Sequence, residues 1–270
     1  MVRITFLGTG GGRFATIYQA RATGGIYVED QRNLHIDPGP GALVRMRSIG
    51  IDPLKTNAIL VSHCHPDHYM DAEILIEAMT EGGTRKQGLL IGSKSVIEGD
   101  DGYGPAISKY HQAKPKYVKV MEPFSKVTMK PIEVWATPSA HTDTTSVGFR
   151  IQTSGGMLSY VSDTQLLEQV IKAHRKCRIL IACVTRPLGQ RIPHHLCTED
   201  AGYLVEKVKP ELAIITHFGM RVIQENPETQ AKWIEESSGV RTVAARDFMS
   251  VDFEKDGIEV SDRLKMAQDK

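Results

Sequence analysis

Residues 63–68 read His-Cys-His-Pro-Asp-His, so four potential metal ligands fall within six positions of the chain. They follow a continuous apolar run, residues 58–61, which is typical of a buried strand. They precede residues 69–80, where apolar side chains recur at the three- and four-residue spacing of a half-buried helix. A strand end is a rigid platform, so side chains just past it can converge on one point.

The four side chains form two pairs. In an extended stretch His63 and His65 project to the same side, because the side-chain period of a strand is two. Asp67 and His68 fall where the chain turns into the helix, so they can point to a second position nearby. Imidazole and carboxylate are ligands of zinc, iron and manganese. Three of the chain's ten histidines lie in this stretch, so a metal site explains it better than an incidental polar loop.

Two metal sites need more ligands than this stretch supplies, and these are expected after other strands. Three polar residues stand shortly after an apolar, strand-like run, namely His141, Asp163 and His217. Taken alone, each has an ordinary alternative, such as a capping aspartate or a histidine that bonds to the backbone. Their shared position favours a ligand role for the set.

Composition indicates an ordinary soluble globular protein, with 41% hydrophobic and 24% charged residues among 270. Lys plus Arg (33) nearly cancels Asp plus Glu (32), so net charge predicts no strong attraction to nucleic acid or to a membrane. Basic clusters at 109–119 and 172–178 are interpreted as solvated helix faces, with RNA phosphate binding as the alternative. The four cysteines show no CxxC spacing and no leader or membrane span is recognised, so a cytoplasmic location is expected.

Short apolar runs predict strands at residues 2–7, 25–28, 34–36, 58–61, 147–151, 158–161, 179–184, 212–215, 242–244 and 248–253. Besides residues 69–80, two helices have clear start signals. One begins at an N-cap at Thr198 and runs to Lys207, and the other begins at Asn226 and ends at Gly239.

The pattern favours one α/β domain over residues 1–270, with residues 262–270 as a polar tail. The part up to about Asp52 is interpreted as nearly all strand and turn, and later parts alternate strand with helix. Residues 81–122 are rich in Gly, Lys and His and have two interpretations. They form either a lid or substrate-facing insertion, or an irregular surface loop.

The series His-x-His-x-Asp-His, then His141, Asp163 and His217, resembles the ligand series of the metallo-β-lactamase superfamily, in the family's order and over nearly the whole chain. The resemblance implies an αβ/βα sandwich of two mixed β-sheets flanked by helices, with two divalent metal ions at one edge. Zinc is the expected metal, and manganese and iron are alternatives.

The resemblance also implies a role for each ligand. The first metal would be held by His63, His65 and His141. The second would be held by Asp67, His68 and His217, with Asp163 bridging both. Asp37, in His-Ile-Asp-Pro-Gly at 35–39, resembles the family's early aspartate, which supports the ligands from behind.

Three segments resemble the tRNase Z branch of the superfamily. Residues 6–10 read Phe-Leu-Gly-Thr-Gly, and residues 216–221 read Thr-His-Phe-Gly-Met-Arg, with Gly where that branch has Ser. His195 stands six residues before Ala201, as a catalytic histidine stands before a helix in that branch. The resemblance implies that His195 contacts the scissile phosphate or protonates the leaving oxygen, with neighbouring His194 as the alternative.

Together these features predict a dinuclear metal-dependent hydrolase of the phosphodiesterase or ribonuclease type, which uses a metal-bridging hydroxide. Asp67 and His195 are its expected catalytic residues. Residues 69–72 depart from the glycine-containing continuation common in tRNase Z, and no Gly/Pro-rich arm for tRNA is found. The expected partner is therefore a phosphodiester substrate, either RNA or something smaller. Relatives also suggest a homodimer.

Other activities use the same ligands. β-Lactamase, lactonase and thioesterase activity are alternatives, although secreted β-lactamases usually have Cys or Ser where this chain has Asp163. An alternative of another class is a non-catalytic metal- or nucleotide-binding protein. Residues 10–15 fit G-x-G-x-x-A after a strand, with acids at Glu29 and Asp30. The glycines are better explained as letting the backbone pass close to the metal site.

Overall fold

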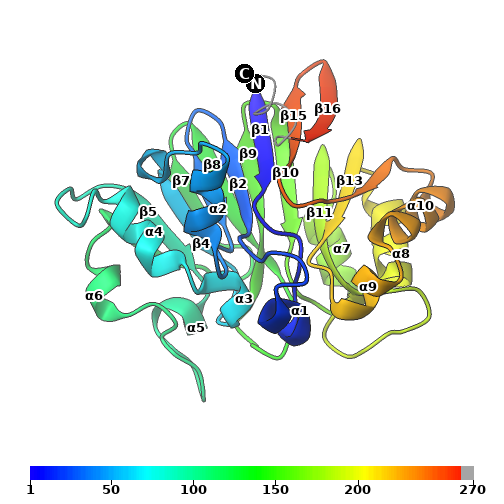
Figure 1. Ribbon diagram of the computed structural model, residues 1–270, viewed down its shortest axis with the longest axis horizontal. Helices are drawn as coiled ribbons and strands as arrows, with labels where there is room; N and C mark the ends of the chain where they lie inside the picture. Colours follow the sequence, from blue (N-terminus) through cyan, green and yellow to red (C-terminus); the bar gives the residue numbers. More distant parts are fainter. Residues whose placement is uncertain (263–270) are drawn as a thin grey trace.

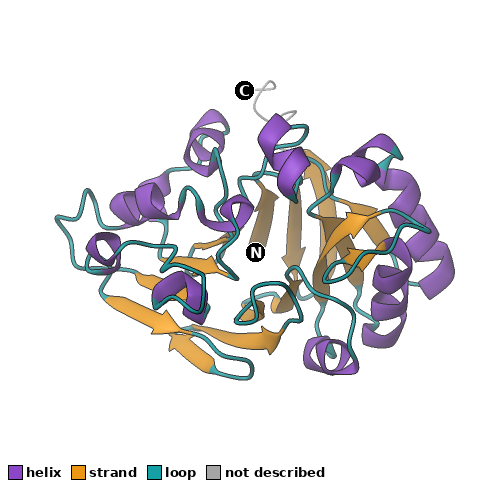
Figure 2. Cartoon of the chain, turned by 90° about the horizontal axis from the view of Figure 1, so that it is seen from below, coloured by secondary structure: helices purple, strands orange, loops and turns teal. Residues whose placement is uncertain are grey.

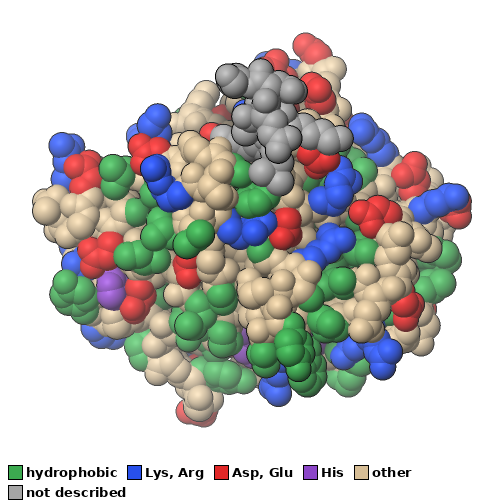
Figure 3. All heavy atoms as spheres, in the orientation of Figure 1, with side chains coloured by type: hydrophobic (Ala, Val, Ile, Leu, Met, Phe, Trp, Pro, Cys, Tyr) green, Lys and Arg blue, Asp and Glu red, His purple; other side chains and the backbone are tan. Residues whose placement is uncertain are grey.

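Two mixed β-sheets lie face to face with helices on their outer sides (Figures 1 and 2). The structure is a computed structural model and describes residues 1–262, so the rest of the predicted polar tail lies outside the described residues. The predicted αβ/βα sandwich is confirmed. On the face drawn in Figure 3, basic and acidic side chains are interspersed.

The first sheet has the strand order β16 (Gly257–Asp262), β15 (Met249–Glu254), β1 (Val2–Phe6), β2 (Ile26–Glu29), β3 (Leu34–Ile36), β4 (Ala58–Val61), β5 (Leu89–Gly92) and β6 (Tyr117–Val120). The second has the order β14 (Thr242–Ala244), β13 (Leu212–Thr216), β11 (Ile179–Arg186), β10 (Gly156–Val161), β9 (Val147–Thr153), β8 (Ile132–Pro138) and β7 (Lys126–Met129). A short β12 (Leu196–Cys197) pairs with β11.

The helices of the first half are α1 (Arg13–Tyr18), α2 (Ala42–Ser48), η1 (Pro53–Lys55), α3 (Pro66–Tyr69), α4 (Ala72–Met79), α5 (Lys94–Ile97) and α6 (Lys109–Gln112). Those of the second half are α7 (Glu168–His174), α8 (Thr198–Val208), α9 (Met220–Gln224) and α10 (Pro227–Ser238). No helix within residues 1–262 is long and apolar enough to cross a membrane.

The core has three layers of buried side chains. One fills the space between the two sheets, where Ile4 of β1 and Phe149 of β9 belong to the same cluster. A second packs the outer face of the first sheet against α2 and α4, through side chains such as Leu75. A third packs the outer face of the second sheet against α7, α8 and α10, through side chains such as Leu204. Both faces of each sheet are therefore covered, and this explains why the central strands have continuous apolar runs.

Several helix boundaries differ from the prediction. The helix expected over residues 69–80 begins later, as α4, after non-helical backbone at Asp71. A separate turn, α3, precedes it and begins at Pro66, a residue favoured at the first helical position. The N-cap of α8 is Cys197 instead of Thr198, and it forms a capping box with Asp200. The helix from Asn226 to Gly239 is confirmed as α10.

The part before Asp52 is not only strand and turn, because α1 and α2 lie within it. Each begins after a glycine, Gly12 or Gly41, and neither has a side-chain cap, so the usual start signal is missing from the sequence. The interpretation of residues 81–122 as an irregular surface loop is wrong for β5, which is fully buried between β4 and β6. Its sequence, Leu-Leu-Ile-Gly, has only three apolar residues in a row, which is too few to predict a strand.

The glycine-rich stretch after β1 is no dinucleotide-binding crossover. A dinucleotide fingerprint requires a strand, a helix and a second strand parallel to the first. Here β2 pairs with β1 in antiparallel fashion, and α1 between them has only six residues. The nucleotide-binding interpretation of this motif is therefore wrong.

Candidate metal centre

The loop between β4 and α3 carries the His-Cys-His-Pro-Asp-His stretch at one edge of the sandwich (Figure 1). The buried carboxylate of Asp143 holds this loop in place. It accepts hydrogen bonds from the Cys64 backbone N–H at 3.1 Å, from the Ser95 hydroxyl and from the Thr145 hydroxyl. Asp143 is not among the predicted site residues, because no motif distinguishes it from a solvated aspartate.

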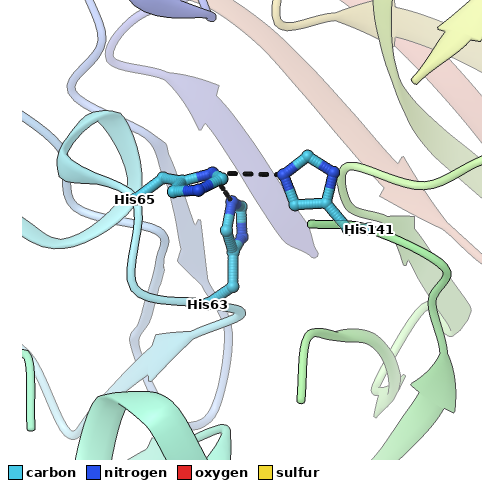
Figure 4. A group of neighbouring side chains, drawn as sticks. All are labelled: His63, His65 and His141. Carbon is cyan, nitrogen blue, oxygen red and sulfur yellow. Dashed lines mark hydrogen bonds between the residues drawn. The ribbon is translucent and has the colours of Figure 1, made fainter. Parts of the chain in front are cut away.

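Three imidazoles form the first cluster, drawn in Figure 4. His63 and His65 come from the loop after β4, and His141 comes from the loop after β8. His65 Nδ1 lies 3.0 Å from His63 Nε2 and 3.1 Å from His141 Nε2. The structure thus brings together the three residues expected at the first metal.

Asp67, His68 and His217 form the second cluster. His217 Nε2 lies 3.0 Å from His68 Nε2 and 3.3 Å from Asp67 Oδ2. Asp67 and His68 belong to α3, whereas His217 follows β13 in the other sheet. The second predicted set of ligands therefore also comes together, across the two sheets.

Asp163 follows β10 and lies between the clusters. Its Oδ2 is 3.9 Å from His141 Nε2 in the first cluster and 3.7 Å from His68 Nε2 in the second. Its Oδ1 is buried and lies 3.2 Å from His217 Nδ1, yet it accepts no hydrogen bond. A buried carboxylate oxygen without a partner is costly, and a bound cation would satisfy it.

Asp37 lies behind the second cluster, as expected. Its Oδ2 is 2.8 Å from His68 Nδ1, and the Tyr160 hydroxyl donates to the same oxygen at 2.7 Å. The Ser62 backbone N–H donates to Oδ1 at 2.7 Å. Asp37 therefore fixes the ring of His68 so that Nε2 points into the centre.

Neutral groups support the other ligands. The Ser62 hydroxyl lies 2.9 Å from His63 Nδ1, and the Thr185 hydroxyl lies 3.2 Å from His217 Nδ1. The Gly12 backbone N–H donates to Asp67 Oδ2 at 2.8 Å. No sequence motif signals these contacts, since each joins a predicted ligand to an ordinary polar group.

The structure distinguishes His195 from His194. The His194 side chain is exposed, and its carbonyl oxygen lies 2.9 Å from His141 Nδ1. The His195 imidazole points to the centre, with Nε2 3.6 Å from Asp163 Oδ2. A pocket of about 440 Å³ adjoins it, lined by Gln165, Leu166, Arg191, Ile192, Pro193, His195 and Asp200. His195 is thus the imidazole that a substrate in this pocket would meet.

Charge is distributed unevenly over the centre. Burial lowers the pKa of His63 well below its usual range, and the nearby His68 adds to this. Burial acts on His68 too, but the carboxylates of Asp67 and Asp37 outweigh it and raise the pKa of His68 well above the usual range. Burial would raise the pKa of Asp163, yet the imidazoles of His217 and His68 hold it well below its usual value. The carboxylates therefore favour positive charge within the second cluster.

The glycine-rich loop passes close to the centre, as predicted. A Cβ on Gly11 would lie 2.2 Å from the ring of His217. Gly11 N–H donates to the Phe218 carbonyl at 3.1 Å, and Phe218 N–H donates to the Thr9 carbonyl at 2.8 Å. Only glycine fits at position 11, because any side chain would displace the His217 ring.

The residues present fit divalent cations. In the first cluster, His65 Nδ1 lies within hydrogen-bond distance of the Nε2 atoms of His63 and His141. Three imidazole nitrogens this close together favour a cation between them. The second cluster adds a carboxylate, and Asp163 stands between the two with one oxygen unsatisfied. Imidazole and carboxylate together are a donor set for zinc, manganese or iron.

Comparison with known proteins finds some that match over nearly the whole chain and others that match locally. The uncharacterized protein MJ1374 of Methanocaldococcus jannaschii is 44% identical over 248 residues, which cover 91% of this chain and 92% of that protein. The metallo-β-lactamase fold protein YhfI of Bacillus subtilis has a TM-score of 0.76 at 19% identity, covering 92% of this chain and 98% of its own. Ribonuclease Z of Pyrococcus abyssi is 33% identical over 98 residues, or 36% of this chain and 31% of that enzyme.

A diphosphatase of the PhnP family also has this fold, with a TM-score of 0.71 at 18% identity, over 94% of this chain and 98% of its own. The family described as "Beta-lactamase superfamily domain" matches residues 32–218, which include every predicted metal ligand. The chain therefore belongs to the metallo-β-lactamase superfamily of metal-dependent hydrolases.

Proposed function

We propose that this protein is a dinuclear metal-dependent phosphodiesterase of the ribonuclease type. The observation that carries the proposal is the position of Asp163 and His195. Asp163 lies between two complete ligand clusters, and His195 reaches its carboxylate while lining an open pocket. Such a site could bind two cations. It also has a further imidazole, that of His195, which belongs to neither three-residue cluster.

Two kinds of evidence support phosphodiesters over other substrates. A carboxylate occupies the position between the clusters, where secreted β-lactamases usually have Cys or Ser. The partial match to ribonuclease Z and the fold shared with a PhnP-family diphosphatase support phosphorus chemistry. The substrate is RNA or a smaller phosphodiester. A homodimer and a cytoplasmic location remain part of the proposal.

Two divalent ions, zinc first and manganese or iron as alternatives, would be held by His63, His65 and His141 and by Asp67, His68 and His217, with Asp163 shared. When bound, such ions supply Lewis-acid stabilisation of phosphoryl oxygens and lower the pKa of a bound water to near 7. The remaining catalysis comes from this chain's own side chains.

Asp67 has one oxygen fixed by the Gly12 N–H, so its carboxylate is held in one orientation and can position the attacking water. Asp37 and Thr185 keep His68 and His217 turned toward the centre. His195 Nδ1 lies 3.2 Å from the Pro193 carbonyl, which fixes the ring with Nε2 facing the centre. From there His195 stabilises the transferring phosphoryl group or donates a proton to the leaving oxygen.

The test is the substitution His195→Ala, measured on bis(p-nitrophenyl) phosphate. We expect turnover to fall by roughly 10²- to 10⁴-fold, the range of a positioned acid, with metal content unchanged. His194→Ala is the matched control, because its ring is exposed and its backbone carbonyl remains in place. Unchanged turnover in His195→Ala would show that His195 has no catalytic role.

The substrate class is tested on a panel of phosphodiester, RNA, β-lactam, lactone and thioester substrates. We expect the highest metal-dependent kcat/KM on a phosphodiester. A higher value on one of the other classes would overturn the proposal. No metal-dependent turnover on any of them would favour a binding protein instead.

A further inference from the structure

Helix α1 exposes an unusual amount of apolar surface for its length. Among its six residues only Ala15 is buried. Phe14 is 65% exposed, and Ile17 and Tyr18 are each 71% exposed. Phe14 and Tyr18 are four residues apart, so they lie on one side of the helix. Figure 3 shows hydrophobic side chains gathered over α1 at the lower edge of the molecule.

This apolar surface adjoins the metal centre. Gly12, the residue before α1, donates its backbone N–H to Asp67 Oδ2 at 2.8 Å. The next residue back, Gly11, lies against the ring of His217. Figure 1 likewise places α1 beside α3, the helix that carries Asp67 and His68. Helix α1 therefore lies within reach of a substrate bound at the centre.

The charge around α1 is suited to an anionic substrate. Residues 10–28 contain two charged side chains, Arg13 and Arg21, and no acid. The carboxylates that meet this segment, Asp67 and Asp247, accept hydrogen bonds from the backbone N–H groups of Gly12 and Ala22. Arg13 is exposed and makes no ion pair with any carboxylate of residues 1–262. Arg21 lies over the Phe218 ring at 5.2 Å, next to His217. Aromatic rings between two cations are the combination that binds single-stranded nucleic acids, through base stacking and phosphate contacts.

We propose that Phe14 and Tyr18 of α1 form a stacking platform for a nucleobase of a single-stranded nucleic acid whose backbone enters the metal centre. The proposal rests on the phosphodiesterase function and deepens it by naming the substrate class. Stacking tolerates any base, so the platform would position a strand without reading its sequence.

The area favours this occupant over a second copy of the chain. At the measured exposures, the side chains of Phe14, Ile17 and Tyr18 offer on the order of 400 Å². A stable dimer buries about 800 Å² on each partner, roughly twice as much. One or two stacked bases, in contrast, fit a surface of this size.

The test measures binding by fluorescence anisotropy with the metal-loaded protein. The probes are a hydrolysis-resistant phosphorothioate oligonucleotide and a matching abasic strand that has the same charge. For Phe14→Ala/Tyr18→Ala we expect the affinity for the base-containing strand to fall at least about fivefold. The affinity for the abasic strand should not change. Phe14→Trp/Tyr18→Phe should retain the affinity for the base-containing strand, because stacking is preserved.

The matched control is Tyr110→Ala/Phe124→Ala, which removes two aromatic side chains that are 67% and 71% exposed elsewhere on the molecule. It should bind both strands as the unaltered protein does. Metal content, measured on every variant, reports whether the centre is intact.

Three results would overturn the inference. The unaltered protein could fail to prefer the base-containing strand, or the α1 variant could lose affinity for both strands equally. The α1 variant could instead change a dimer into a monomer without altering oligonucleotide binding, which would assign the surface to a second copy. Hydrolysis of bis(p-nitrophenyl) phosphate by the unaltered protein tests the phosphodiesterase function separately. Its absence together with a stacking effect would refute that function while the binding platform stood.

Discussion

The two ligand clusters lie side by side, but different chemistry supports them. The first consists of imidazoles alone, and its supports are a hydroxyl, from Ser62, and a backbone carbonyl, from His194. The second contains the Asp67 carboxylate and has the Asp37 carboxylate behind His68. The first cluster is therefore neutral, whereas the second is rich in negative charge.

This difference predicts how each cluster responds to protons. In the first cluster burial lowers the pKa of His63 well below its usual range and that of His141 to about 4, so these rings stay unprotonated and ready to bind. In the second cluster the carboxylates raise the pKa of His68 well above its usual range. A metal at the second cluster must therefore displace a proton, and one at the first need not.

The largest effect is expected from removing the residue that joins the clusters. Asp163→Ala should lower turnover on a phosphodiester by more than about 10³-fold, above the usual cost of losing one stabilising group, because both proposed metal positions would lose a ligand. Metal analysis should show loss from both. Asp101→Ala, an exposed carboxylate, is the control. Retention of two tightly bound ions by Asp163→Ala would mean that the clusters are independent.

The next effect separates the clusters. Asp67→Ala should bind one ion per chain instead of two, since the three imidazoles of the first cluster are untouched. Turnover should fall by about 10²- to 10³-fold. The measurement is metal content after dialysis, with turnover in the same samples. Loss of both ions would contradict the idea that the imidazole cluster holds metal by itself.

A smaller effect is expected when the residue behind a predicted ligand is changed, and it should be larger for the carboxylate of Asp37 than for the hydroxyl of Thr185. Asp37→Asn should weaken binding of the second ion by about 10- to 100-fold, because His68 loses the carboxylate that orients it. Asn suits this position, where φ is +49°, so the backbone should not change. Thr185→Val, the matched removal of a neutral support, should cost less. Equal losses in the two variants, measured by competition with a chelator, would show that charge is not what matters.

The smallest expected effect is a difference in pH dependence. As pH falls, the second cluster should lose its ion first, because the raised pKa of His68 favours the proton. The first cluster should keep its ion to a lower pH, because burial lowers the pKa of His63. Metal content after equilibration between about pH 7 and pH 4 measures both midpoints. Simultaneous release, or release from the first cluster alone, would refute the comparison.

The sequence predicted which side chains would converge, because of where these residues stand along the chain. His141, Asp163 and His217 each follow a buried strand, and the strands end at the same edge of the sandwich. These three side chains come close together only if the strands run in the right direction and stand in the right order in the sheet. The resemblance to the family supplied both. The roles assigned to these residues stay predictions, whereas their convergence is observed.

The residues that hydrogen-bond to the predicted ligands could not be predicted, because each contact joins elements that are far apart in the sequence. Asp143 reaches Cys64 across 79 positions, and Thr185 reaches His217 across 32. The choice between His194 and His195 depended on backbone geometry, since φ at His194 is +64° and turns its ring away. Helices α1 and α2 were missed for a related reason, because their starts have no side-chain cap.

The position of β1 has a consequence for how the chain assembles. Its residues pair with β2 on one side and with β15 on the other, in a register that matches Val2 with Phe253. The first strand to be synthesised therefore has an open edge until almost the last strand exists. The loop after β1 meets Phe218, so the glycine loop also waits for the second half of the chain. During synthesis, the residues of the first cluster are all present after His141, but those of the second are complete only after His217, so the full centre can form only late in folding.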